Sequence, residues 1–470
     1  MPDPPTVRRE HAAPPLRRRP RGLDRLDPAW LGLAVVVASL AIYVLSNPSR
    51  QNVYNHFVWQ AAAFLDGRAA IDHPVTTGPV ANDYFQDVYP VADQPGRALV
   101  PFPPLPAVLL LPLVALFGLT TNAALVAAFL GAMNTGLAWR LAWRLTRTHA
   151  AALLATSFYA FGTVAWYAAM LGSTWFLAHV VASTFLLLAI TAALDGDRRT
   201  GPTIAGITRT AARRLTGLVD LRQFGVGLLF GTAALARLTV LFGAPFFLFV
   251  GSGGGFRKRA LSAGLGAAVP VAILLAYNLV SAGSLFHPGY EYLYATETVP
   301  RPAGLLADLI PALRELEYRA GEWSIEDPRY LPGNLVIMLA WLPHVDASCG
   351  LALLEQDCPL VRPDELGMSL LLTSPAYLLA LPLLRFGLRR RIVLGAALAV
   401  AAIALVNLMH FSQGWVQFGY RFSNDFAPFA LVLVTLAIAR LGIRPLTVGL
   451  VVASIAINAW GVYWGVTLGW

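Results

Sequence analysis

The sequence predicts an all-α polytopic membrane protein with about eleven transmembrane helices. Of its 470 residues, 57% are hydrophobic and only 13% are charged, too few charges to cover a soluble domain of this size. Apolar runs recur at lengths close to the thickness of the hydrocarbon core. Arginines gather in short clusters between these runs, which is the pattern of the positive-inside rule. The three observations together place most of the chain in a membrane.

The net charge of +9 does not indicate nucleic-acid binding, because the arginines flank the apolar runs. Residues 1–28 are rich in arginine and proline and are predicted to form a disordered cytoplasmic tail. The apolar run at 29–46 is too long for the core of a signal peptide, and no small-residue cleavage site follows it. We therefore interpret it as a retained first span.

The remaining spans follow from the alternation of apolar runs and basic clusters. The predicted spans lie at 29–46, 121–143, 150–170, 174–194, 260–281, 368–384, 392–410, 425–439 and 446–466. The apolar region 223–250 has basic residues at both flanks, so it is predicted to be a hairpin of two short helices with Arg237 near its turn. This gives eleven spans, with the amino end cytoplasmic and the carboxyl end outside.

The apolar segment 103–118 is not counted as a span. It is shorter than the roughly 20 residues that a spanning helix needs, and counting it would place the Arg140 cluster outside. We expect a re-entrant or interfacial helix on the outer face. Residues 29–470 then form a single transmembrane domain, with outer loops near 47–120, 282–367 and 411–424.

The second outer loop contains the only two cysteines, Cys349 and Cys358. Because the exterior is oxidising, a disulfide is favoured over two free thiols.

The first outer loop begins with an apolar helix and continues into an acidic, aromatic stretch. Residues 53–65 show a helical apolar face with polar residues toward another face, which is typical of a helix lying in the interface, although plain packing accounts for most of them. Asp83 and Asp87 follow among aromatic residues, and they would share one face if that stretch were helical. A carboxylate at a partly dehydrated surface suits a general base acting on a hydroxyl. Solvated loop acids are the alternative.

Arg237 is unusual because an arginine in an apolar hairpin is energetically costly. Its guanidinium fits a phosphate bidentately, so the phosphate of a lipid carrier is one candidate partner. If the turn reaches the outer interface, simple snorkelling explains the residue equally well. His179, in the predicted span 174–194, is interpreted as a core histidine and not as a ligand.

The second and third outer loops add further polar residues that suit a sugar or a lipid head group. Anchoring in the aromatic belt explains the rings, but it does not explain the charged pair Arg421 and Asp425 at the mouth of a span. The candidate substrate-binding residues are His56, His287, Tyr290, Glu291, Tyr420 and Asp425.

Five segments together resemble the GT-C superfamily of polytopic glycosyltransferases, in particular the bacterial mannosyltransferase and aminoarabinose-transferase families. The segments are 55–67 (NHFVWQAAAFLDG), 102–118 (FPPLPAVLLLPLVALFG), 231–245 (GTAALARLTVLFGAP), 277–292 (YNLVSAGSLFHPGYEY) and 417–429 (QFGYRFSNDFAPF). The chain departs from the pattern at Asn55, where such enzymes often have an aspartate that begins the interfacial helix. An amide does not act as a base, so either Asp83 or Asp87 takes that role, or the chain has a different activity or none.

The resemblance implies that a sugar moves from a polyprenyl-phosphate lipid donor to an acceptor at the outer face of the cytoplasmic membrane, with inversion. On this hypothesis Asp87 or Asp83 is the catalytic base, while Arg237 and Arg421 bind the donor phosphate. A transporter or flippase of lipid-linked saccharide is the alternative, and so is a catalytically silent membrane scaffold. The acidic outer loops suggest a divalent cation, but no ligand spacing specifies a metal site. The sugar, the acceptor and the oligomeric state stay open.

Overall fold

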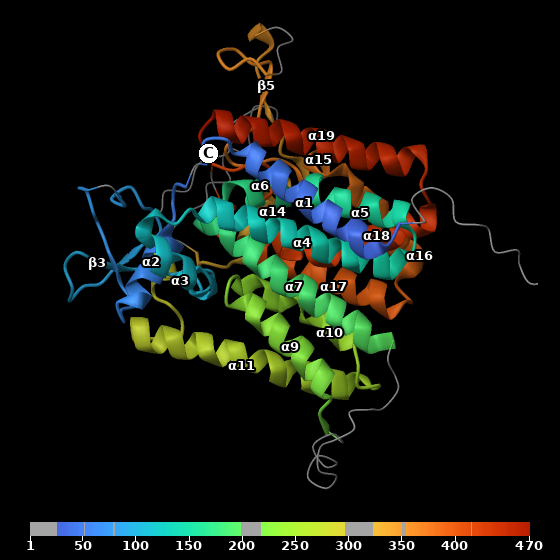
Figure 1. The fold of residues 1–470 in the computed structure, drawn as a ribbon, viewed down its shortest axis with the longest axis horizontal. Coiled ribbons are helices and arrows are strands. Elements are labelled where there is room, and N and C mark those ends of the chain that lie inside the picture. The colour runs from blue at the N-terminus through green and yellow to red at the C-terminus, as the bar shows by residue number, and fades with distance from the viewer. Residues whose placement is uncertain are drawn as a thin grey trace, which may run out of the picture.

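A computed structural model describes residues 26–50, 52–78, 80–198, 218–296, 323–349, 354–414 and 416–470. Most of the described residues are helical, and the long helices run roughly side by side in one bundle (Figure 1). The predicted cytoplasmic tail up to residue 25 and a central part of the second outer loop, residues 297–322, lie outside the described residues.

Eight of the predicted spans are present at the expected positions. Seven helices in the described residues are long and apolar enough to cross a membrane, and a bent pair of helices makes an eighth. The seven are α1 (Pro28–Ser46), α4 (Ala123–Thr146), α7 (Thr174–Arg198), α11 (Phe256–Ala282), α17 (Arg391–Leu408), α18 (Ser423–Leu441) and α19 (Pro445–Thr467). The bent pair is α5 (His149–Phe161) and α6 (Ala165–Leu171), at 54°.

The other three predicted spans are shorter or interrupted. The hairpin consists of α9 (Leu221–Ala234), followed after Arg237 by the 3-10 helix η3 (Leu238–Gly243) and by α10 (Ala244–Phe249). The segment at 368–384 is broken into α15 (Leu370–Thr373), η7 (Pro375–Leu379) and α16 (Ala380–Gly387). Their length does not identify them as complete spans, so the predicted count of eleven is not confirmed.

The core of the bundle lies around α7 and α18. In each of these two helices, 78% of an apolar 18-residue stretch is buried inside the protein, whereas in α1 only 17% of the corresponding stretch is buried. A helix that is apolar on all sides belongs in a core or in lipid. Here α7 and α18 occupy the protein interior, and α1 keeps most of its apolar surface on the outside of the bundle. Polar side chains such as His179 of α7 and Asp425 of α18 are therefore enclosed by protein.

The basic clusters meet at one end of the bundle, as the positive-inside pattern requires. Asp195 of α7 pairs with Arg140 and Arg144 of α4, and Asp197 of α7 is 3.8 Å from Arg391 of α17. The opposite end contains α2 (His56–Leu65), α3 (Leu105–Phe117), a small sheet and the carboxyl terminus (Figure 1). That the basic end faces the cytoplasm stays a prediction.

The segment 103–118 forms α3 and does not cross the bundle. The backbone N–H of Leu105, at its start, donates to the carbonyl of Leu235 at the turn of the hairpin, with an N···O distance of 2.9 Å. After its end, the carbonyl of Thr121 accepts from Asn52, which lies between α1 and α2. Both ends of α3 therefore lie at the same end of the bundle, as expected for a re-entrant or interfacial helix.

The neighbouring helix α2 differs from the expected interfacial helix. Its residues from His56 to Ala61 are all buried, and the predicted polar side contacts protein. For example, the Gln60 amide donates to the Tyr277 hydroxyl of α11 at 3.0 Å. The burial of α2 fits the alternative given above, a helix whose pattern reflects packing, because its polar side chains find their partners inside the protein.

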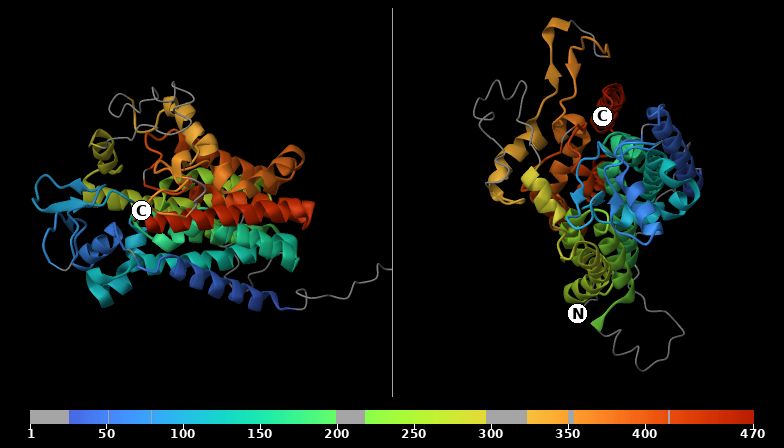
Figure 2. Two further views of the ribbon diagram at one scale, coloured as in Figure 1. Left: turned by 90° about the horizontal axis from the view of Figure 1, so that it is seen from above. Right: turned by 90° about the vertical axis from the view of Figure 1, so that its left-hand side faces the viewer.

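Two small sheets lie at the end of the bundle opposite the basic clusters, which we call the acidic end. In the first outer loop, β1 (Ile71–Asp72), β3 (Arg97–Leu99) and β2 (Tyr89–Pro90) pair antiparallel in that order, with Ile71 opposite Ala98 and Tyr89 opposite Leu99. In the second loop, β4 (His344–Val345) pairs with β5 (Val361–Arg362) in a hairpin that projects from the bundle (Figure 2). The predicted disulfide between Cys349 and Cys358 closes this hairpin.

The predicted orientation is testable with an impermeant maleimide, in a background with Cys349→Ser and Cys358→Ser. Gln94 and Leu388 are both exposed and lie at opposite ends of the bundle. We expect Gln94→Cys to be labelled in intact cells and Leu388→Cys to be labelled only after permeabilisation, because the basic end stays in the cytoplasm. The reverse labelling pattern would place the candidate site in the cytoplasm.

Candidate active site

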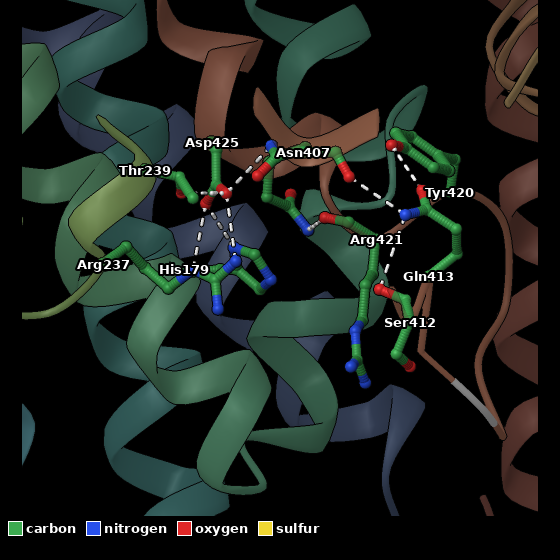
Figure 3. A network of polar contacts seen from close by, with 10 residues as sticks. His179, Arg237, Thr239, Asn407, Ser412, Gln413, Tyr420, Arg421 and Asp425 are labelled. Carbon is green, nitrogen blue, oxygen red and sulfur yellow. Dashed lines mark hydrogen bonds and ion pairs between the residues drawn. The ribbon is translucent and has the colours of Figure 1, made fainter. Parts of the chain in front are cut away.

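The most enclosed charged group described is Asp425, in the first turn of α18. Its side chain is fully buried, and four residues donate hydrogen bonds to its two oxygens (Figure 3). The donors are His179 Nδ1 at 2.8 Å, Arg237 Nε at 3.3 Å and Nη2 at 3.1 Å, Thr239 Oγ1 at 2.7 Å, and Asn407 Nδ2 at 3.3 Å. They come from α7, the hairpin turn, η3 and α17, so one carboxylate joins four segments that are distant in sequence.

The ion pair between Arg237 and Asp425 compensates the charge that the membrane domain buries. A carboxylate without a partner at this depth is expensive, whereas a guanidinium that donates two hydrogen bonds offsets much of that cost. The first turn of α18 adds the positive end of the helix dipole. The Arg237 side chain is 18% exposed, against 0% for Asp425, so the arginine also reaches the open side of the network.

Asp87 lies close to Arg421 on a neighbouring part of the same end. The indole Nε1 of Trp175 donates to Asp87 Oδ2 at 2.7 Å. The charge of Arg421 acts on this carboxylate, and the Arg421 guanidinium lies 5.9 Å from the Trp175 ring centre. Burial raises the pKa of Asp87, against the stabilising effects of the indole N–H and of Arg421. This carboxylate thus combines partial burial with a raised affinity for a proton.

The backbone around Asp87 is a turn and not a helix. Asp87 has a φ of 58°, in the left-handed region. Asp83 is exposed, so the expectation that both carboxylates share a helical face was wrong. Asn82, at the turn that contains Asp83, bonds the backbone of Val75 and of Asp72, both at 2.7 Å. The two acids therefore lie in different environments, and Asp87 is the one next to an arginine.

Arg421 is held against bare backbone and aromatic rings. Its guanidinium lies 5.3 Å from the Phe422 ring centre, and a Cβ at Gly414 would come within 2.5 Å of its Cζ. Gly414 also has a φ of +87°, which favours glycine. The Gly414 backbone therefore lies directly beside the guanidinium, with no room for a side chain between them.

Tyr290 connects the two halves of the site. It lies on α12 (Gly289–Thr296), and the charges of Arg237, Asp87 and Glu326 all act on it. Burial raises the pKa of Tyr290 to about 12, so its hydroxyl keeps its proton at neutral pH and is available as a donor. Tyr290 therefore senses the charges of both Asp87 and Arg237, and that these residues bind substrate together stays a prediction.

Several other predicted substrate-binding residues have supporting positions. His56 is completely buried, where its Nε2 donates to the carbonyl of Gln86 at 2.6 Å and thereby anchors the backbone next to Asp87. Burial lowers the pKa of His56 to about 4, so the ring is neutral. Tyr420 is also buried and donates to Gln413, whose amide in turn donates to the carbonyl of Asn407. His56 and Tyr420 therefore position the site and do not line it.

Two predicted residues lie apart from the network. His287 is buried, and its Nδ1 accepts from the backbone N–H of Gly289 at 3.0 Å, which fixes the start of α12. Burial lowers the pKa of His287 to about 4. Glu291 is exposed. Neither side chain contacts Asp87 or Asp425 in the described structure, so the prediction that both bind substrate is not supported by their positions.

Sequence reasoning missed His179, Trp175, Thr239 and Asn407. His179 was interpreted as an ordinary core histidine, yet it bonds the central carboxylate. Trp175 and His179 are four residues apart on α7 and therefore share a face, which is a usable signal. Asn407 gives a second usable signal, because it is a polar residue at the end of an apolar span. In the described residues no group of three His, Cys, Asp or Glu side chains has the arrangement of a metal site.

The comparisons with known proteins concern the fold. No protein-family model and no curated protein matches the chain by sequence. A structure of ArnT from Cupriavidus metallidurans bound to undecaprenyl phosphate is similar over 94% of this chain and 77% of its own, at 13% identity and a TM-score of 0.49. The apo oligosaccharyltransferase of Archaeoglobus fulgidus is similar over 93% of this chain, at 15% identity and a TM-score of 0.44.

This chain spans 56% of the length of the oligosaccharyltransferase. The likeness is one of helix arrangement, and the chemistry proposed below rests on the residues of this chain.

The Asp425 network generates a prediction about stability. Asp425→Ala removes the acceptor and leaves Arg237 without its counter-charge, so it should destabilise the protein by about 3 kcal/mol. The double variant Arg237→Met with Asp425→Leu should recover part of this loss, because it leaves no unpaired arginine, whereas His179, Thr239 and Asn407 still lack their acceptor. Thermal unfolding in detergent measures both. A double variant that is less stable than Asp425→Ala would contradict this account of the pair.

Proposed function

We propose that the protein transfers a sugar from a polyprenyl-phosphate lipid to an acceptor hydroxyl at the outer face of the cytoplasmic membrane. The observation that carries the proposal is that one acid and one cation share a tryptophan: the Trp175 indole donates to Asp87 at 2.7 Å, and the Arg421 guanidinium lies 5.9 Å from the same ring. Burial raises the pKa of this acid, and the charges of Asp87 and Arg237 both act on Tyr290. A base and a set of phosphate-binding cations are the groups that such a transfer needs. The GT-C resemblance of the sequence points to the same chemistry.

In the proposed reaction, Asp87 accepts the proton of the acceptor hydroxyl as its oxygen attacks the anomeric carbon. A new C–O bond forms on one face of the sugar while the bond to the phosphate oxygen breaks on the other, so the configuration inverts. The polyprenyl phosphate leaves with the bonding electron pair. Its added negative charge develops next to Arg237 and Arg421, which stabilise it electrostatically.

The remaining groups of the site prepare these partners. Trp175 donates to Asp87 and holds its carboxylate in one orientation. Asp425 does the same for Arg237, because it accepts from Nε and one Nη and leaves the other Nη for a ligand. Tyr290, protonated at neutral pH, is a candidate donor to a phosphate or sugar oxygen. The acceptor and the sugar itself are not specified by these contacts.

The base is tested by a pair of matched variants. Asp87→Asn keeps the shape but removes the base, so transfer should fall by about 100-fold or more. Asp83→Asn makes the same change four residues away on an exposed side chain and should keep most of the activity. Transfer is measured in proteoliposomes with a synthetic polyprenyl-phosphate sugar. Full activity of Asp87→Asn would exclude this residue as the base.

The pH profile tests the environment of Asp87. Because burial raises its pKa, the base form is lost as the pH falls through a value above the ordinary carboxyl range, and kcat/KM should fall with it. Trp175→Phe removes the N–H that favours the charged form, so the acid limb should move to higher pH. The profile of kcat/KM is measured for both proteins. An acid limb that moves to lower pH would contradict the assignment of Asp87.

A further inference from the structure

His179 lies between the Asp425 carboxylate and a small internal cavity. Its side chain is 1% exposed, and its Nδ1 is 2.8 Å from Asp425 Oδ1. The same carboxylate accepts from Arg237, Thr239 and Asn407. An ionised carboxylate only accepts hydrogen bonds, so the hydrogen in this contact belongs to His179 Nδ1. In the neutral ring, Nε2 is then a bare acceptor.

The other side of the ring faces a cavity with a second acceptor. The cavity has about 10 Å³ open to the centre of a water molecule. Tyr43, Asn134, Tyr159, His179, Ser183 and Asn424 contribute its polar lining. The Asn134 amide nitrogen donates to the carbonyl of Val180 at 2.9 Å, and this contact leaves the amide oxygen as the remaining polar atom. Both His179 Nε2 and Asn134 Oδ1 are buried without a protein hydrogen-bond partner.

These two acceptors, which face the same cavity, are both satisfied by a molecule that donates two hydrogen bonds. A single water supplies them, and the cavity has the size that one buried water needs. A doubly protonated His179 would instead place a second positive charge near Arg237 and Arg421, whose charges both act on the ring. The neutral ring with one bridging water satisfies both acceptors without that repulsion.

We propose that His179 is a positioning residue, held as the neutral Nδ1–H tautomer by one internal water shared with Asn134, and that it fixes Asp425 and thereby the phosphate-binding face of Arg237. The inference rests on the proposed function, because it assumes that Arg237 binds the phosphate of the lipid. Loss of the Nδ1–H would leave Asp425 Oδ1 with only Arg237 Nε, at 3.3 Å, among the contacts described above. The Arg237 guanidinium is then free to rotate toward Asp425 and away from the phosphate of a ligand.

Substitutions of His179 separate this role from a general contribution to packing. Asn places an amide N–H near the position of Nδ1, whereas Phe fills the volume with no donor. We expect His179→Phe to raise the KM for the lipid donor about tenfold, the effect of losing a hydrogen bond to a charged group. His179→Asn should stay within about threefold of the native protein. The acid limb of the pH profile, which reports Asp87, should not move in either variant.

His149 provides the matched control. It is a buried histidine at the start of α5, where it packs on Trp143 at a ring distance of 4.5 Å, at the basic end of the bundle. His149→Phe should lower thermal stability without raising the donor KM. An equal rise of the donor KM in His149→Phe and His179→Phe, or no rise in His179→Phe, would overturn the positioning role.

Binding of polyprenyl phosphate itself separates this inference from the proposed reaction. Native mass spectrometry of the purified protein should show weaker binding of that lipid to His179→Phe than to His179→Asn or His149→Phe. This result would support the positioning role even if no sugar transfer were detected, whereas transfer with equal lipid binding in all three variants would overturn it. Asn134→Leu, which fills the cavity, should also weaken lipid binding, and unchanged binding would overturn the bridging water.

Discussion

A buried negative charge is the constraint around which the acidic end of the bundle is organised. Asp425 has no exposed surface, and the low dielectric of a membrane interior makes such a charge tolerable only with counter-charge and hydrogen bonds on every side. The four donor residues come from segments between residues 179 and 407, so the compensation also fixes how α7, the hairpin turn, α17 and α18 meet. Packing and electrostatics therefore depend on one another here.

The helical framework could be predicted from the sequence because its signals are local. The apolar runs predicted α1, α4, α7, α11, α17, α18 and α19 with small errors at their ends. The positive-inside pattern also showed that segment 103–118 does not cross. The pattern did not predict where helices are short or interrupted, as at residues 370–387. A run of apolar residues does not reveal the break at Ser374 or the 3-10 helix that follows it.

The site was only partly predictable because its contacts are not local. Arg237 was identified as a candidate from its cost in apolar surroundings. Arg421 and Asp425 were identified as a charged pair among aromatic residues at the mouth of a span, and Asp87 from its aromatic neighbours. Their mutual arrangement depends on tertiary contacts between residues as far apart as 246 positions, as for His179 and Asp425. The predicted helix at Asp83 and Asp87 was wrong for a different reason: Asp83 lies in a turn whose start is held by the Asn82 side chain, and Asp87 has a positive φ.

The absence of a side chain at Gly414 restricts which residue can stand at position 421. A Cβ at residue 414 would meet the guanidinium carbon itself, so the space beside Arg421 is a slot whose width fits a flat cation. Lysine carries the same charge on a tetrahedral ammonium, which neither fills such a slot nor presents two parallel N–H groups. Shape as well as charge is therefore specified at this position, and it is the missing side chain of the glycine that specifies it.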